Sequence, residues 1–262
     1  MSTTATAREV IDIDAQVIDR LIDVMSNASI EAFLGQLPWP ADDFQIEAIE
    51  KLERSNGVLV SAPTSSGKTV VADYVVWKSF LDTAVSPHRV VYTTPLKALS
   101  NQKYRDLCHR HGEENIGLIT GEHTVNEDAP VVVMTTEILR NIIYEEPERL
   151  DSVRDVVLDE VHYIDDFPRG TVWEEVIIEA PRHIRFIGLS ATVSNVDELA
   201  QWMSERRGEI ATVKRTERPV SLHLWLALSN SFHNLFEPGG AVNRKTLDLA
   251  RNAEVMSVSC TS

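Results

Sequence analysis

A stretch of eight residues has the composition of a phosphate-binding loop. It reads Ala62-Pro63-Thr64-Ser65-Ser66-Gly67-Lys68-Thr69, and it follows the apolar run Val58–Val60. In a strand-to-helix turn of this kind, backbone N–H groups surround the phosphates of a nucleotide, Lys68 reaches the terminal phosphates and the Thr69 hydroxyl ligates Mg²⁺. Ala62 stands where the usual pattern has its first glycine, and a side chain this small still lets the turn close. The sequence therefore predicts a site for a nucleoside triphosphate with Mg²⁺.

A second candidate element is an apolar run that ends in two adjacent carboxylates, Val156-Val157-Leu158-Asp159-Glu160-Val161-His162. At such a strand end we expect Asp159 to hold the Mg²⁺ together with Thr69. Glu160 is then the group that orients or deprotonates the water attacking the γ-phosphate. The alternative interpretation is a strand capped by solvated acids. The nearby Asp165 and Asp166 lack the strand-end position, and we expect them in a loop or a helix cap.

Short apolar runs alternate with helical segments on either side of these residues. The runs that read as buried strands are Val58–Val60, Val90–Tyr92, Gly117–Ile119, Val131–Met134, Val156–Leu158 and Phe186–Leu189. The segments that read as helices are Val70–Phe80, Lys97–His109, Glu137–Tyr144, Val172–Glu179 and Val196–Met203. Strands without polar alternation, separated by helices, indicate an α/β fold with a parallel sheet covered on both faces. Functional residues then lie in loops at the carboxyl ends of the strands.

Composition and charge narrow the class of protein. The 262 residues are 43% apolar, which is ample for a core, and the net charge of −15 argues against whole-surface attraction to nucleic acid. A local groove stays possible, because Lys97, Lys103 and Arg105 cluster in one segment. No apolar run is long enough to cross a membrane, the start Met1–Arg8 has no hydrophobic signal segment, and the cysteines are two. We therefore expect a cytoplasmic protein without a membrane partner.

The N-terminal region predicts one amphipathic helix. From Ile13 to Met25 the apolar residues recur at helical spacing, and the opposite face is acidic. These apolar residues are Val17, Ile18, Leu21, Ile22 and Met25. Such a helix docks either on the core of its own chain or on a partner, and packing on the core is the simpler expectation.

The order of further motifs resembles superfamily 2 DExH-box helicases. Ala62–Thr69, Asp159–His162 and Ser190–Thr192 are similar to motifs I, II and III of that family, and further matches are Thr94–Tyr104 to motif Ia, Thr120-Gly121 to a strand-contacting motif and Thr135–Arg140 to motif Ib. The segment His162–Glu175 resembles the superkiller-type and exosome-associated RNA helicases, and in particular bacterial HelY-type helicases. The resemblance spans roughly Trp39 to Trp202. It implies a RecA-like sheet, one lobe of a two-lobe helicase core.

The resemblance also implies roles for individual residues. Gln45 matches the glutamine that reads adenine, so the nucleotide would be ATP, and Trp39 would stack on the base unless it is a core residue. Lys68, Asp159, Glu160 and His162 would form the catalytic set, while Ser190 and Thr192 would couple hydrolysis to strand movement. The residues expected along the nucleic-acid path, where they would grip phosphates and sugars of any sequence, are Lys97, Ser100, Asn101, Gly121, Thr135 and Thr136.

The family's second RecA-like lobe, which supplies an arginine to the transferring phosphoryl group, has no counterpart in the sequence. Arg206, Arg207 and Arg215 lack the motif surroundings and are expected at the surface. The expected organisation is an acidic helical extension over residues 1–37, a RecA-like ATP-binding domain over residues 38–210 and a truncated connector over residues 211–262. The chain is thus interpreted as the N-terminal lobe of a larger helicase, either a fragment or a truncated product.

Three functions follow as hypotheses. The first is an ATP-dependent RNA helicase that moves along single-stranded or partly duplex RNA, with DNA as an alternative substrate because phosphate contacts discriminate poorly. The second is a module that binds ATP and nucleic acid without turnover in isolation. The third is a P-loop kinase of a small substrate, which leaves Ser190-Ala191-Thr192 and Trp173-Glu174-Glu175 without a role.

Overall fold

The computed structural model describes residues 15–81, 88–166, 169–192, 195–218, 223–228, 231–234, 236, 241–246, 248 and 257–261. The chain divides into two units, Met1–Thr216 and Glu217–Ser262. Some positions used in the sequence analysis lie outside the described residues. They are Met1–Arg8, Ile13 at the expected start of the N-terminal helix, Phe167 and Pro168 in the resemblance segment, and the side chains of Val17, Ile18, Leu21 and Ile22.

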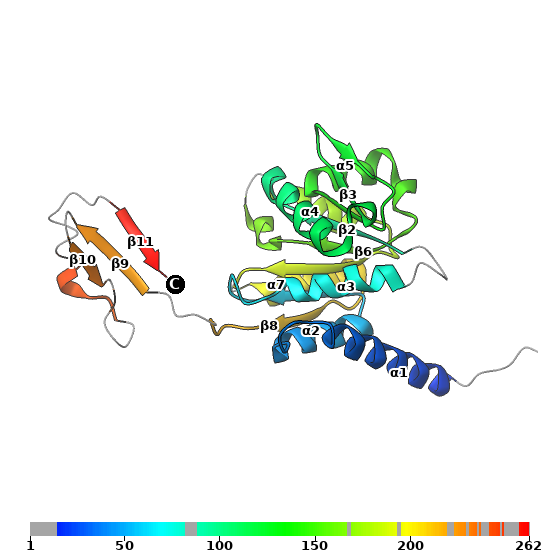
Figure 1. The fold of residues 1–262 in the computed structure, drawn as a ribbon, viewed down its shortest axis with the longest axis horizontal. Coiled ribbons are helices and arrows are strands. Elements are labelled where there is room, and N and C mark those ends of the chain that lie inside the picture. Colours follow the sequence, from blue (N-terminus) through cyan, green and yellow to red (C-terminus); the bar gives the residue numbers. More distant parts are fainter. Residues whose placement is uncertain are drawn as a thin grey trace, which may run out of the picture. The chain divides into compact units, whose positions relative to one another are not determined.

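The first unit is built around an eight-stranded sheet with the order β4-β3-β5-β2-β6-β7-β1-β8 (Figure 1). All neighbouring strands are parallel except β3 and β4. The strands are β1 (Gly57–Ser61), β2 (Arg89–Thr94), β3 (Ile116–Ile119), β4 (Thr124–Val125), β5 (Val131–Thr135), β6 (Val153–Leu158), β7 (Arg185–Ser190) and β8 (Ala211–Lys214). The predicted α/β fold with a parallel sheet is confirmed.

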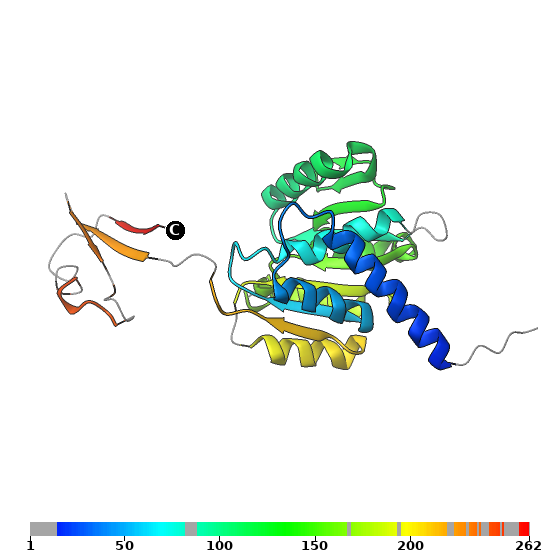
Figure 2. The ribbon, with the colours of Figure 1, turned by 60° about the horizontal axis from the view of Figure 1, so that its bottom comes forward.

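Helices cover both faces of this sheet, as the two views in Figures 1 and 2 show. They are α1 (Ala15–Leu34), α2 (Asp43–Arg54), α3 (Thr69–Leu81), α4 (Lys97–His111), α5 (Thr136–Glu145), α6 (Thr171–Glu179) and α7 (Val196–Arg207), with short 3-10 turns η2 (Glu113–Asn115), η3 (Pro147–Leu150) and η4 (Val161–Asp165). One apolar core joins the sheet to α1, α2, α3 and α4, and a second joins it to α5, α6 and α7. Strands buried on both faces explain the apolar runs in the sequence.

Each predicted strand and helix between residues 58 and 203 is present, with ends that differ by a few residues. Helix α2, strands β4 and β8 and the 3-10 turns η2, η3 and η4 were not predicted. Helix α2 is rich in charge, and its apolar contacts come from Phe44, Ala48, Ile49 and Leu52 at helical spacing. Strand β8 is a short edge strand that pairs with β1, so the sheet continues past residue 210, where the sequence pattern placed the end of the domain.

The N-terminal helix is longer than expected, and its last turns pack on the core. Ile30 and Phe33 are buried, and the ring of Phe33 lies 5.3 Å from the ring of Tyr74. Met25, which was expected on the apolar face, is instead 70% exposed. The helix therefore docks on its own chain through residues downstream of the predicted segment.

Arg207 corrects one expectation, because it is buried rather than on the surface. Its guanidinium donates hydrogen bonds to the carbonyl oxygens of Ala180 (2.6 Å), Pro181 (2.6 Å) and Ile184 (3.1 Å). It also lies 5.0 Å from the ring of Phe186. Burial lowers the pKa of Arg207 to about 10. This arginine holds the end of α7 against the segment that leads into β7.

The second unit contains a three-stranded antiparallel sheet with the order β10-β9-β11. Its strands are β9 (His223–Leu228), β10 (Ser231–Asn234) and β11 (Ser257–Thr261). All three strands lie within residues 211–262, the region expected to be a connector. No helix in the part of the chain that the structure describes is long and apolar enough to cross a membrane.

Candidate nucleotide and strand site

The predicted phosphate loop lies between β1 and α3. Ser65 and Gly67 both adopt positive φ angles, 66° and 83°, so the loop turns sharply before the first residue of α3, Thr69. A side chain at position 67 would also meet the amide of Gln45, because a Cβ there would lie 2.5 Å from Nε2. The Ser66 hydroxyl is buried and has no hydrogen-bond partner among the described residues. An orphaned donor at this place suits a phosphate ligand.

Lys68 folds back over this loop. Its ammonium donates hydrogen bonds to the carbonyl oxygens of Ala62 (3.0 Å) and Pro63 (3.3 Å). Burial lowers the pKa of Lys68, and the carboxylates of Glu160 and Asp159 partly oppose this shift. A desolvated ammonium held by neutral carbonyls would gain from an anionic partner.

Asp159 is fixed at the carboxyl end of β6 by two donors. The Tyr92 hydroxyl donates to Oδ2 (2.9 Å), and the Glu160 backbone N–H donates to Oδ1 (3.0 Å). Burial, followed by the charge of Asp159, holds the pKa of Tyr92 well above its usual range, so this hydroxyl keeps its proton. From the sequence Tyr92 is only a strand residue, because nothing in its spacing shows that its hydroxyl reaches the neighbouring strand β6.

Glu160 has a left-handed backbone conformation, with φ 54° and ψ 44°. For a residue with a side chain this conformation costs about 1 kcal/mol or more. It turns the chain from β6 into η4, and it brings the Glu160 carboxylate to 3.3 Å from Nδ1 of His162. Such strain occurs at functional sites, where the surrounding structure imposes it.

His162 connects the end of β6 with the end of β7. The Ala191 backbone N–H lies 3.3 Å from the same Nδ1 that faces Glu160. Nδ1 accepts from Ala191 when it is unprotonated and donates to Glu160 when it carries a proton. Ser190 is fully buried, and its hydroxyl has no partner among the described residues, whereas Thr192 is exposed.

The residues expected to hold Mg²⁺ supply hard oxygen donors, the Thr69 hydroxyl and the Asp159 carboxylate. Mg²⁺ commonly takes one or two protein ligands and completes its shell with waters and phosphate oxygens. No group of three or more His, Cys, Asp or Glu side chains that could hold a metal occurs within the described ranges. The donor set therefore fits a metal that arrives with a nucleotide.

The two residues expected to contact adenine differ in their surroundings. Gln45 is 4% exposed; its Oε1 accepts from the Asp42 N–H (2.9 Å), and its Nε2 donates to the Gly67 carbonyl (2.9 Å). It thus ties the start of α2 to the phosphate loop. Trp39 is 58% exposed, so the alternative that it is a core residue is wrong, and its ring is free to stack.

The residues expected along the strand path lie after β2, β3 and β5. Lys97 is exposed and paired with Glu122, Gly121 is exposed, and Asn101 and Thr135 are half-buried. Ser100 and Thr136 are fully buried. The Ser100 hydroxyl bonds to that of Thr94 at 2.7 Å. A strand could therefore reach positions 100 and 136 through their backbone and not through their side chains.

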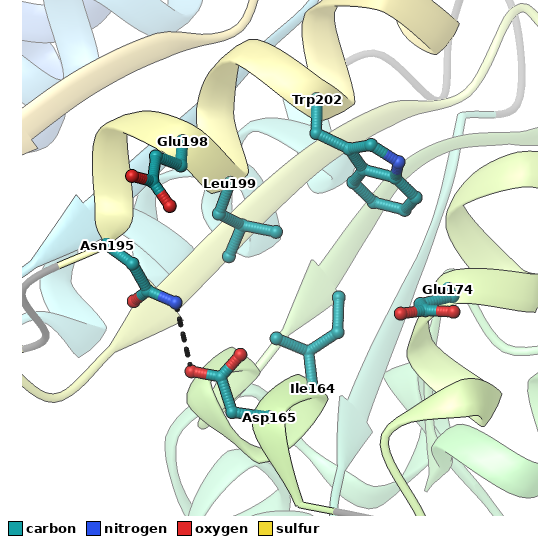
Figure 3. A pocket seen from close by; sticks show the side chains of 7 residues that line it. All are labelled: Ile164, Asp165, Glu174, Asn195, Glu198, Leu199 and Trp202. Carbon is teal, nitrogen blue, oxygen red and sulfur yellow. Dashed lines mark hydrogen bonds between the residues drawn. The ribbon is translucent and has the colours of Figure 1, made fainter.

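A hollow lies between η4, α6 and α7 (Figure 3). Ile164, Leu199 and Trp202 form its apolar part, and Asp165, Glu174 and Glu198 bring carboxylates to it. Asp165 accepts a hydrogen bond from the Asn195 amide (3.1 Å). Asp165 is the last residue of η4 rather than a loop residue, and Asp166, which was expected in a loop or a helix cap, follows as the C-cap of η4.

Comparison with known proteins gives a consistent result. The family model for DEAD/DEAH box helicases matches residues 42–199. A probable helicase HelY of Mycobacterium tuberculosis is 46% identical over 210 residues, which cover 80% of this chain and 23% of that protein. The DExH-box ATP-dependent RNA helicase DExH15 of Arabidopsis thaliana is 42% identical over 254 residues, which cover 92% of this chain and 21% of the relative.

Solved structures agree on the fold. The helicase Lhr of Mycobacterium smegmatis, bound to single-stranded DNA and AMP-PNP, is 27% identical with a TM-score of 0.54, and the match covers 72% of this chain and 27% of that one. The chain thus spans about a quarter or less of the length of these proteins. The first unit has their RecA-like fold. With the phosphate loop, the Asp159-Glu160 pair and the matching family model, the chain belongs to the DEAD/DEAH box helicase family.

Proposed function

We propose that this chain is the ATP-binding lobe of a DExH-box ATP-dependent RNA helicase. The observation that carries the proposal is the row of loops after β1, β7 and β6, which are neighbours in the sheet. The first loop holds Lys68, the second Ser190 and the third the Asp159-Glu160 pair. His162 joins the second and third loops through Ala191 and Glu160.

In this proposal the chain's residues divide the work. Backbone N–H groups of the loop Pro63–Thr69 and the Lys68 ammonium bind the phosphates of ATP. Asp159, held by Tyr92, and Thr69 would hold the Mg²⁺, which when bound would neutralise the developing charge on the phosphates. Glu160 orients the attacking water and takes its proton. Trp39 and Gln45 contact the base, and the Gln45 amide has a second N–H and a second oxygen lone pair beyond its present hydrogen bonds.

The strand would cross the loops after β2, β5 and β3, and Ser190, Thr192 and His162 would transmit hydrolysis to it. A second RecA-like lobe would close over ATP and supply an arginine. RNA is the proposed substrate because relatives such as DExH15 are named RNA helicases, and DNA is the second candidate because Lhr was solved with single-stranded DNA. We propose a cytoplasmic location.

The test is ATP hydrolysis by this chain with and without single-stranded RNA or DNA, beside equilibrium binding of a fluorescent ATP analogue. We expect nucleotide binding with little stimulated turnover, because an arginine finger contributes roughly 10³ to 10⁵ in rate. Glu160→Gln is the control, since it should bind the analogue normally and lose any turnover. Absence of nucleotide binding, or turnover above background that Glu160→Gln retains in full, contradicts the proposal.

A further inference from the structure

Arg169 bridges the loops that follow three adjacent strands. It lies between η4 and α6, downstream of β6. Its Nη2 donates a hydrogen bond to the Pro95 carbonyl (2.7 Å), just past the end of β2. The same nitrogen lies 3.8 Å from the carboxylate of Glu137, just past the end of β5. Strand β2 has β6 and β5 as its neighbours, so one side chain spans this part of the sheet edge.

The backbone beside Arg169 fixes where this side chain starts. A Cβ at Gly170 would lie 1.9 Å from the Ile164 carbonyl oxygen, so only glycine lets the chain pass η4 at this point. The Gly170 N–H donates to the Asp166 carbonyl (2.7 Å). The Arg169 guanidinium lies 5.9 Å from the ring of Tyr163. The backbone position of Arg169 is therefore fixed, and its guanidinium lies between Tyr163 on one side and Pro95 and Glu137 on the other.

The guanidinium is nevertheless poorly neutralised. A guanidinium has five N–H donors, and Nη2 uses one of them on a neutral carbonyl. The carboxylate of Glu137 is too distant for a short charged hydrogen bond, and the side chains of both residues are 39% exposed. Arg169 therefore keeps donors that face solvent at the edge where the strand path was placed.

Lys97 shows the same arrangement one loop away. It follows β2, and it pairs with Glu122, which follows β3 and is 70% exposed. Arg169 and Lys97 are thus each paired with a carboxylate from another loop of this edge. In a chain with a net charge of −15, such pairs keep cations in place where no anionic ligand is bound.

We infer that Arg169 contacts a phosphate of the bound strand and leaves Glu137 when it does so. The inference rests on the proposed function, because it places a further residue on the same strand path. A phosphate offers a guanidinium two charged acceptors, whereas Glu137 holds it at 3.8 Å. The hydrogen bond to Pro95 stays in place and aims the side chain. Arg169 is then a binding residue as well as a link between the loops.

The two members of the pair give opposite predictions. Arg169→Ala removes a phosphate contact, and we expect the affinity for a fluorescein-labelled single-stranded RNA oligonucleotide to fall about tenfold. Arg169→Lys keeps the charge and should lose less. Glu137→Gln removes the competing carboxylate and should raise the affinity about twofold to threefold. A link that only positions the loops predicts weaker binding for Arg169→Ala and for Glu137→Gln alike.

Salt dependence separates contact from positioning. For single strands, the slope of log affinity against log salt changes by about 0.7 for each phosphate neutralised. Arg169→Ala should lower the slope by about that amount between about 50 and 200 mM salt. The matched control is Arg149→Ala. Arg149 carries the same charge, is partly exposed and pairs with Glu127 and Glu146, but it lies in η3, which precedes β6. This control should keep the slope of the unmodified chain.

The outcomes are distinct. Strand binding by the unmodified chain, with a reduced slope in Arg169→Ala and tighter binding in Glu137→Gln, supports the inference. An unchanged slope in Arg169→Ala, or weaker binding in Glu137→Gln, overturns the inference and leaves the proposed function standing. If the unmodified chain binds the fluorescent ATP analogue and no RNA or DNA strand at all, both the strand path and the role of Arg169 are refuted.

Discussion

Buried charged side chains have different partners at the two ends of the eight-stranded sheet. At the amino ends of β6 and β7, Asp155 and Arg185 form an ion pair at 2.7 Å, and nearby Glu53 and Lys78 form another at 2.6 Å. The four side chains are between 6% and 16% exposed. Each charge has an oppositely charged partner within the chain, although Glu53 Oε1 and Arg185 Nη2 have no hydrogen-bond partner among the described residues, and the pairs join α2 and α3 to the sheet.

At the carboxyl ends the match is incomplete. Lys68 donates to carbonyl oxygens of its own loop, and Asp159 accepts from a neutral tyrosine, so neither charge is met by an opposite charge at hydrogen-bond distance among the described residues. The difference teaches that one end contributes stability, whereas the other holds polar groups in an arrangement that a ligand completes. Substitutions at the two ends should therefore change different quantities.

The largest effect should follow from breaking the pair at the amino end. Asp155→Asn leaves the Arg185 guanidinium buried without its carboxylate, and we expect the free energy of unfolding to fall by about 3 to 5 kcal/mol. Urea denaturation measures this loss. Asp151→Asn is the control, because Asp151 is exposed. A similar loss of unfolding free energy in both variants would show that the Asp155–Arg185 pair stabilises the fold no more than an exposed carboxylate does.

Two lysines at opposite ends test the comparison directly. Lys68→Ala should weaken binding of a fluorescent ATP analogue about a hundredfold, or roughly 2.7 kcal/mol, because the phosphates lose their ammonium. Its free energy of unfolding should not fall, since a desolvated ammonium is removed. Lys78→Ala should lower the free energy of unfolding, because the carboxylate of Glu53 loses its ion-pair partner. It should leave binding of the ATP analogue unchanged, because Lys78 lies outside the phosphate loop. Loss of both properties in either variant would refute the separation.

Tyr92 sharpens the comparison within the carboxyl end. Tyr92→Phe removes the donor to Oδ2 of Asp159, and the carboxylate becomes less well oriented for Mg²⁺. We expect the Mg²⁺ concentration at half-maximal binding of the ATP analogue to rise about fivefold, for a hydrogen bond worth about 1 kcal/mol. Tyr104→Phe, on α4, is the control and should keep the original midpoint. Equal midpoints in the two variants would remove Tyr92 from the site.

The smallest effect concerns acid pH. Burial raises the pKa of Glu53, but the hydrogen bond and charge of Lys78 outweigh it, so the folded pKa lies below its ordinary value of 4.5. A depressed carboxyl pKa adds stability that is present above pH 4.5 and lost as the pH falls through the folded pKa. Urea denaturation between pH 6 and 3 should therefore show a shallower loss in Glu53→Gln than in the unmodified chain. Parallel pH profiles would contradict this.

Periodicity was enough to predict the elements that are apolar throughout. Runs such as Val156–Leu158 are buried on both faces, so their composition and their structure agree. It was not enough for α2, whose apolar residues are diluted by charge, or for β8, whose single buried residue is Val213. How far a short amphipathic helix or strand is buried depends on which other elements pack on it, and the local sequence does not contain that information.

The candidate site divides in the same way. Loop and carboxylate motifs predicted Lys68 and Asp159, because their chemistry depends on neighbours in sequence. Tyr92 and Arg169 act across strands, at contacts of 2.9 Å to Asp159 and 2.7 Å to Pro95, and no spacing in the sequence shows such contacts. For the same reason the burial of Ser100 was not foreseen.

Gly170 has a consequence for how the sequence can change over time. Because even a methyl group at this position would overlap the carbonyl of Ile164, no single substitution offers an intermediate that still folds η4 against α6. Substitutions over evolutionary time can change the length or charge of the side chain at position 169, but they cannot replace the glycine at position 170. A saturation library of position 170, selected for soluble expression, should return glycine alone.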